Sequence, residues 1–113
     1  MVESKEAVEV LAALAQETRL AVFRLLVEQG PEGVAAGEIA ERLGLPGATL
    51  SFHLKELSHA DLVTARQAGR FVFYSANYRT INGLIDYLTR NCCRGATCDM
   101  VCAPATQRRR RSQ

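Results

Sequence analysis

The chain has 113 residues, a length that predicts one domain with a modest core. A hydrophobic content of 48% and a charged content of 23% are ordinary for globular proteins and exclude a chain that is disordered throughout. No apolar run approaches the ~20 residues that a membrane-spanning helix needs, and the first residues lack an apolar secretory segment. We therefore expect a soluble, cytoplasmic protein with no membrane partner.

Charge is distributed unevenly along the chain. Residues 1–61 carry five basic and ten acidic side chains, whereas residues 62–113 carry nine arginines and two aspartates. The basic half is compatible with an anionic partner but does not identify one. The run from Arg108 to Arg111 predicts a flexible tail, whose attraction for phosphate would carry no sequence information.

Helical periodicity dominates the first 60 residues. Four helices are predicted there, over residues 3–15, 18–29, 38–43 and 48–60. Thr18 is expected to cap the second helix, and Gly30 with Pro31 to end it. Gly33 to Gly37 is expected to form a small-residue loop. The short third helix, the turn Gly44 to Gly47 and the fourth helix together predict a helix-turn-helix.

Two short segments of alternating polarity follow, over residues 62–66 and 70–76. Their Val, Thr, Phe and Tyr content predicts a β-hairpin that bends at residues 67–69, and a last helix is predicted over residues 80–91. The expected fold is mainly α with a small β-hairpin, a winged helix-turn-helix. We expect it to occupy residues 1–91, followed by a cysteine-bearing, Arg-rich segment over residues 92–113.

The fourth predicted helix has a face suited to DNA. Leu50, Leu54 and Leu57 share its buried side, so the opposite side can enter a major groove and contact base edges or phosphates. Its candidate DNA-binding residues are Ala48, Thr49, Ser51, Phe52, His53 and Lys55. The alternative is a surface helix that only packs through its three leucines. An exposed Phe52 has a solvation cost and argues against that alternative.

His53 on this helix, and Arg66 and Arg70 on the hairpin, can each be interpreted in two ways. His53 lies nearer the buried side, which favours a hydrogen-bonded packing role or a phosphate contact over a metal role. Arg66 and Arg70 flank the predicted bend, as a wing that grips the DNA backbone requires. The alternative for the bend is an ordinary solvated turn.

Four cysteines lie within eleven residues: Cys92, Cys93, Cys98 and Cys102. No other cysteine exists to staple the fold, so the cluster favours a soft metal or redox chemistry over structural disulfides. If the last helix frays at Asn91, the first three thiolates can converge on a trigonal As(III) or Sb(III) ion. Cys102 is an additional candidate ligand that would complete a tetrahedral set for zinc or cadmium. Redox-active thiols and inert surface thiols are the remaining interpretations.

Several stretches together resemble the ArsR/SmtB family of winged-helix repressors. The matching stretches are residues 14–20 and 23–26 for the second helix, 38–45 and 50–57 for the helix-turn-helix, and 60–63 with Arg66, Gly69, Arg70 and Tyr74 for the wing. The resemblance covers about residues 5–90. It implies a non-enzymatic repressor that binds double-stranded operator DNA with an inverted repeat and is released by a ligand.

The resemblance also implies a homodimer packed through the first and last helices. The corresponding interface residues are Val8, Leu11, Ile81, Leu84, Ile85 and Leu88.

The resemblance fits some ligand sites of the family and not others. The Cys-Val-Cys arsenic site has no thiol counterpart at Val34 to Glu38, and Asp86 lacks a nearby His for the zinc site. Cys92, Cys93 and Cys98 are similar to the C-terminal site of some arsenic-responsive members. The resemblance therefore implies As(III) as the inducer ligand. The alternatives are Sb(III), a methylarsenical, cadmium or zinc as the ligand, or a thiol redox sensor.

Overall fold

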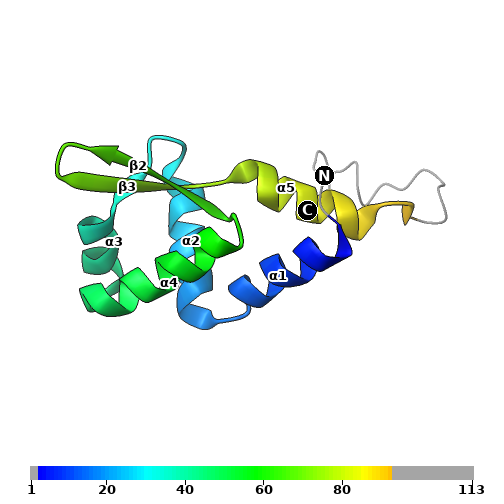
Figure 1. Cartoon of the computed structure of the whole chain (residues 1–113), viewed down its shortest axis with the longest axis horizontal. Helices are drawn as coiled ribbons and strands as arrows, with labels where there is room; N and C mark the ends of the chain where they lie inside the picture. The colour runs from blue at the N-terminus through cyan, green and yellow to red at the C-terminus, as the bar shows by residue number, and fades with distance from the viewer. Residues whose placement is uncertain (1–2, 93–113) are drawn as a thin grey trace, which may run out of the picture.

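The computed structural model describes residues 3–92 of the chain. In these residues it contains five helices and a three-stranded sheet (Figure 1). In chain order the elements are α1 (Ser4–Leu14), α2 (Glu17–Gln29), β1 (Val34–Ala35), α3 (Ala36–Leu43), α4 (Gly47–His59), β2 (Val63–Ala68), β3 (Phe71–Ala76) and α5 (Tyr78–Thr89). The mainly α fold with a hairpin is confirmed, and the predicted helices agree with the observed ones to within two residues at most ends.

The helix ends follow from local chemistry. Glu3 and Glu6 form a capping box at the start of α1, in which each side chain accepts a hydrogen bond from the other residue's backbone N–H. Gln16 caps α2 by accepting a hydrogen bond from the Arg19 backbone N–H at 2.8 Å. The prediction that Thr18 caps α2 is therefore wrong, because the helix begins one residue earlier, at Glu17.

The turn between α3 and α4 is confirmed. Gly44 ends α3 in the left-handed conformation, with φ of +65°, and its backbone N–H donates to carbonyls of the last turn of α3. Glycine adopts this conformation without the steric penalty of a side chain. Pro46 then precedes α4 with the extended backbone typical of an N-cap.

The sheet has one strand more than the predicted hairpin. β1 pairs antiparallel with β3, which lies between β1 and β2. The expected loop from Gly33 to Gly37 therefore contains a two-residue strand and the start of α3. A strand of two residues has no visible period in the sequence, and only its pairing with β3 defines it.

The hairpin bends closer to β3 than the sequence predicts. Ala68 pairs with Phe71, so the loop consists of Gly69 and Arg70, while Gln67 and Ala68 belong to β2. Gly69 has a φ of +63°. A glycine at the first of two loop positions is typical of the turns that match the twist of paired strands.

A single core joins the helix-turn-helix to the sheet. Its fully buried side chains come from α2, β1, α3, α4 and the residue before β2: Val22, Leu26, Val34, Ile39, Leu57 and Leu62. The Tyr78 hydroxyl donates to the Val27 carbonyl at 3.1 Å and connects the start of α5 to this core. None of the helices in residues 3–92 is long and apolar enough to cross a membrane.

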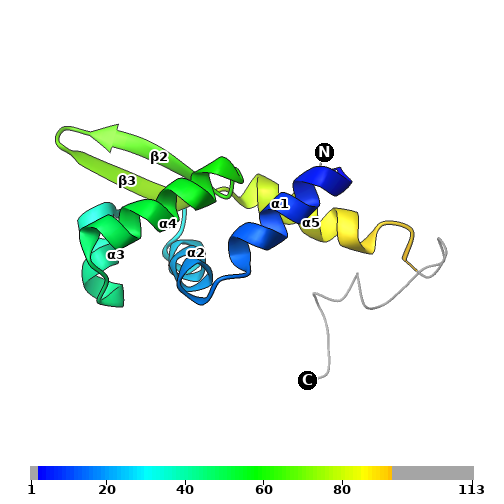
Figure 2. The same ribbon diagram turned by 60° about the horizontal axis from the view of Figure 1, so that its bottom comes forward.

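The two ends of the molecule are built from different elements. The wing formed by β2 and β3 lies with α3 at one end, and α1 packs beside α5 at the other (Figures 1 and 2). α5 ends at Thr89, two residues before the predicted end. Asn91 then adopts a φ of +61°, so the chain has left the helix before Cys92.

Candidate nucleic-acid interface

The outward face of α4 is polar except for one aromatic ring. Ala48, Thr49, Ser51, Phe52 and Lys55 are all exposed, as the sequence predicts, while Leu50, Leu54 and Leu57 are buried. Phe52 is 56% exposed, a large apolar surface for the centre of a solvated helix. α4 is thus anchored by its leucines and presents short polar groups, one ring and one cation.

The start of α4 is suited to a phosphate. Pro46 at the N-cap makes no side-chain capping bond, and the first turn holds no acidic residue. The first backbone N–H groups of the helix and its positive dipole end are therefore available to an anion.

His53 does not belong to the outward face. It is only 8% exposed, and its Nδ1 lies 3.3 Å from Nη1 of Arg19. Its ring meets the Phe52 ring edge to face, with 5.5 Å between centroids. His53 is therefore packed and hydrogen-bonded as one of its two interpretations expects. Unlike the other candidates on α4, it does not lie on the outward face, because α4 turns this position toward α2.

Of the two arginines expected at the wing tip, only Arg70 lies there. It is exposed and occupies the second loop position after Gly69. Arg66 pairs with Phe73, three rungs away from the loop. Its guanidinium donates to the Glu32 carbonyl at 3.1 Å and lies 5.0 Å from the Phe73 ring centroid. Arg66 is therefore held against the base of the wing, which corrects its expected place at the tip.

The basic side chains on α3, α4 and the wing differ in whether they form ion pairs. Arg42 on α3 is ion-paired with Glu38 one turn away. Lys55 and Arg70 have no ion pair within residues 3–92, so their charges are not neutralised by a carboxylate there.

The apolar residues of α1 and α5 divide into two sets. Val8, Leu11, Ile85 and Leu88 are exposed, and Leu88 is 59% exposed. Leu84 is buried in the core of its own chain, and Ile81 packs partly against that core. Leu84 is thus oriented inward, away from the partner that the family resemblance implies. The remaining four are exposed side chains on two helices that contact each other, and they are together named here the α1–α5 surface.

The candidate metal ligands lie at the edge of the described chain. Cys92 is half-buried, two residues beyond the C-cap of α5 at Arg90. Cys93, Cys98 and Cys102 lie outside the described residues, as does the run Arg108 to Arg111. Within residues 3–92, no three His, Cys, Asp or Glu side chains are arranged to hold a metal ion.

Arg19 contacts the helix that carries the candidate site, and the sequence did not indicate this. Its Nε donates to the Ala13 carbonyl at the end of α1 at 2.7 Å, and its Nη1 faces His53 on α4. Nothing in the sequence near Arg19 indicates His53, which lies 34 positions away. All that the sequence shows near Arg19 is a single cation three residues after Gln16, which does not indicate a partner on another helix.

Comparison with known proteins matches this geometry. A family described as a helix-turn-helix domain matches residues 14–66. The transcriptional activator HlyU of Vibrio cholerae serotype O1 is 33% identical over 90 residues, which cover 80% of this chain and 81% of that protein. The arsenical resistance operon repressor of Bacillus subtilis is 33% identical over 73 residues, covering 65% of this chain and 68% of its own.

Solved structures share the whole architecture. An ArsR-like transcriptional regulator from Rhodococcus sp. RHA1 superposes with a TM-score of 0.68 at 30% identity, covering 76% of this chain and 78% of that chain. A homodimeric winged helix-turn-helix DNA-binding domain from Mycobacterium bovis gives a TM-score of 0.63 at 26% identity, covering 83% and 87%. The relatives and structural neighbours of this chain are DNA-binding regulators rather than enzymes. The chain belongs to the ArsR family of winged-helix transcriptional regulators.

Proposed function

We propose that this regulator is an arsenite-responsive repressor that binds an inverted-repeat operator as a homodimer and is released when As(III) binds Cys92, Cys93 and Cys98. We place this repressor in the cytoplasm, where it would reach its operator. The observation that carries the proposal is the position of Cys92, which follows the end of the helix that bears half of the α1–α5 surface.

The DNA-reading set follows from exposure. Ala48, Thr49, Ser51, Phe52 and Lys55 enter the major groove, and Arg70 contacts the phosphate backbone from the wing. His53 supports these contacts from inside the fold, and the exposed Arg66 supports them by holding the hairpin to the Glu32 carbonyl. In a homodimer a twofold axis relates the two copies of α4, which explains the requirement for an inverted repeat. The two copies must also lie one helical turn of DNA apart.

The α1–α5 surface is the proposed dimer contact. Its four exposed apolar side chains are Val8, Leu11, Ile85 and Leu88, and burying them against a second copy removes apolar area from water. The homodimeric neighbour from Mycobacterium bovis supports this assembly.

The ligand assignment rests on thiol chemistry. The chain leaves α5 before Cys92, since Asn91 has a φ of +61°, so the helix does not set the direction of the Cys92 side chain. Three thiolates suit As(III), and Sb(III) fits the same set. The similarity to the Bacillus subtilis arsenical resistance repressor supports arsenic. HlyU has the same identity over more of the chain and is named only as an activator. The second candidate is a repressor that senses a methylarsenical, cadmium, zinc or the thiol redox state.

The first test is a gel shift with an inverted-repeat fragment from the promoter of the protein's own gene, with and without arsenite. We expect binding that arsenite abolishes. Binding that persists in arsenite would contradict the inducer and leave the DNA-binding function standing. Absence of binding at low salt would contradict both.

The second test separates sensing from DNA binding. Cys92→Ser and Cys93→Ser should keep operator affinity and lose release by arsenite. Coupling between two ligands is reciprocal, so operator DNA must weaken arsenite binding by the same factor. Equal arsenite affinity with and without operator would refute the coupling, and release retained in both variants would place the site elsewhere.

A further inference from the structure

We propose that Arg19 is a positioning residue for DNA binding, which holds α4 at a fixed orientation to α1 through His53. The inference rests on α4 being the DNA-reading helix. Arg19 lies at the start of α2, and its guanidinium reaches both neighbouring helices. Nε donates to the Ala13 carbonyl on α1 at 2.7 Å, and Nη1 lies 3.3 Å from Nδ1 of His53 on α4.

The contact with α1 uses a carbonyl at the helix end. Ala13 is next to the last residue of α1, where carbonyls lack a partner within the helix. Arg19 supplies that partner, and its own backbone N–H is held by the Gln16 side chain at 2.8 Å. The base of the side chain and its Nε are therefore both fixed, which leaves the distal nitrogens pointing at α4.

The contact with α4 defines the state of His53. A guanidinium has only N–H donors, so Nδ1 of the ring must accept, and the proton of the neutral ring lies on Nε2. Because His53 is 8% exposed, water does not readily replace Arg19 as its partner. His53 and Phe52 are sequence neighbours with rings in contact, so a rotation of His53 also moves a ring on the DNA-reading face.

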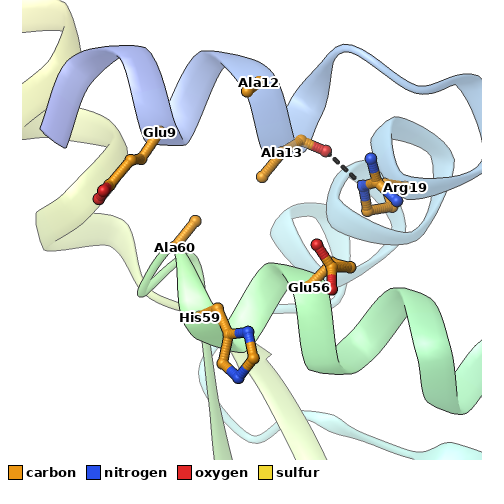
Figure 3. Close-up of a pocket in the computed structure, with 7 residues that line it drawn as sticks. All are labelled: Glu9, Ala12, Ala13, Arg19, Glu56, His59 and Ala60. Atoms are coloured by element: carbon orange, nitrogen blue, oxygen red, sulfur yellow. Dashed lines mark hydrogen bonds between the residues drawn. The ribbon is translucent and has the colours of Figure 1, made fainter. Parts of the chain in front are cut away.

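A pocket beside Arg19 lies between α1 and α4, the two helices that Arg19 connects. The pocket has a volume of about 400 Å³ and lies between α1 and α4, with Glu9, Ala12 and Ala13 on one side and Glu56, His59 and Ala60 on the other (Figure 3). Arg19 lines one end of it, and its bond to Ala13 is visible there. Side-chain packing does not fill this space, so the guanidinium bridge restricts a movement of α4 relative to α1 that packing there leaves open.

The test exchanges His53 for two amides of different length. The polar group of Asn stands near the position of Nδ1, whereas that of Gln reaches the position of Nε2. Operator affinity is measured at fixed salt on the fragment bound in the gel shift, with thermal unfolding of every variant. We expect His53→Asn to stay within about threefold of the native affinity. His53→Gln and Arg19→Ala should lose about tenfold or more, the effect of losing a hydrogen bond from a charged group.

Two further variants distinguish a bridge from a simple charge. Arg19→Lys keeps the cation but lacks the planar fork that reaches two partners, so it should lose affinity as Arg19→Ala does. The double variant Arg19→Ala with His53→Ala should bind no worse than the weaker single variant, because both changes break one contact. Additive losses, native affinity in Arg19→Lys, or retention in His53→Gln with loss in His53→Asn would each overturn the proposal.

A measurement on the native protein covers the case in which a variant fails to fold. The ¹⁵N spectrum of the His53 ring should show the proton on Nε2 and an accepting Nδ1 at neutral pH. A proton on Nδ1 would overturn the bridge. If the native protein binds no operator, the proposed function fails, whereas a wrong variant pattern with native binding intact refutes only the role of Arg19.

Discussion

Gly33, between α2 and β1, combines a φ of +84° with a close backbone neighbour. A Cβ added there would lie 2.8 Å from the Tyr74 carbonyl oxygen on β3, a backbone atom that cannot move without breaking the sheet. Gly37, inside α3, has an ordinary φ and no atom within 4 Å of an added Cβ. The two glycines thus occupy opposite environments, although the sequence places both in one small-residue stretch.

Gly33→Ala should therefore lower the free energy of unfolding by about 1–3 kcal/mol, the cost of a side chain in the left-handed region plus the clash. Gly37→Ala should raise it by about 0.5–1 kcal/mol, because Ala is favoured over Gly within a helix. Urea unfolding of both variants measures the difference. Equal effects of the two substitutions would contradict the close approach at Gly33.

Phe52 is the residue on α4 whose exposure is hardest to explain by folding alone. Phe52→Ser removes a ring that is 56% exposed, so thermal stability should change little. Operator affinity should fall about ten- to a hundredfold if the ring contacts thymine methyl groups. Loss of the preference for particular base pairs would accompany it. Unchanged affinity with unchanged stability would place Phe52 outside the interface.

At the scale of elements, the wing separates two arginines with different tasks. Arg70 follows the turn glycine and points its charge to solvent, whereas Arg66 ties the hairpin to the loop before β1 through the Glu32 carbonyl. Under the proposed function, Arg70 contributes charge to a DNA contact, whereas Arg66 restricts where the hairpin points.

The salt dependence of operator binding distinguishes these tasks. Arg70→Ala should reduce the slope of log affinity against log salt by about one for each wing. Each phosphate contact releases a counterion on binding, so fewer are released when a contact is lost. Arg66→Ala should leave that slope unchanged and lower the unfolding temperature slightly. An equal change of slope in both variants would mean that Arg66 leaves the Glu32 carbonyl and reaches the DNA.

At the scale of the whole molecule, the wing lies at one end of the fold, and α1 and α5 lie toward the other (Figure 2). Each end exposes apolar side chains to nearly the same extent, 58% for Phe71 on the wing and 59% for Leu88 on α5. This match provides a controlled test of which end joins two copies.

Leu88→Asp should shift the protein from dimer to monomer in sedimentation, because a charge in an apolar contact has no compensating partner. Operator affinity should fall with it, since one monomer reads only one half-site. Phe71→Asp, which replaces an equally exposed ring by the same charge, should leave the dimer intact. A dimer retained in Leu88→Asp and lost in Phe71→Asp would reverse the assignment of the two ends.

The sequence by itself determined the helices, the helix-turn-helix and the hairpin. Their signals are local: apolar residues at helical spacing in α4, a glycine at the turn after α3, and alternating residues in β3. The same periodicity separated Leu50, Leu54 and Leu57 from the exposed Ser51, Phe52 and Lys55, so most of the outward face of α4 was predictable.

Only the tertiary structure decided which side chains bind distant parts of the chain. Arg66 meets Glu32, and Arg19 meets His53, each across 34 positions of sequence, and β1 exists only because β3 pairs with it. Leu84 and Ile85 are neighbours on one predicted stripe, yet the packing of α5 buries the first and exposes the second. The physical reason is that a helical period defines an apolar stripe, while the three-dimensional placement of the helix defines which part of that stripe its own core covers.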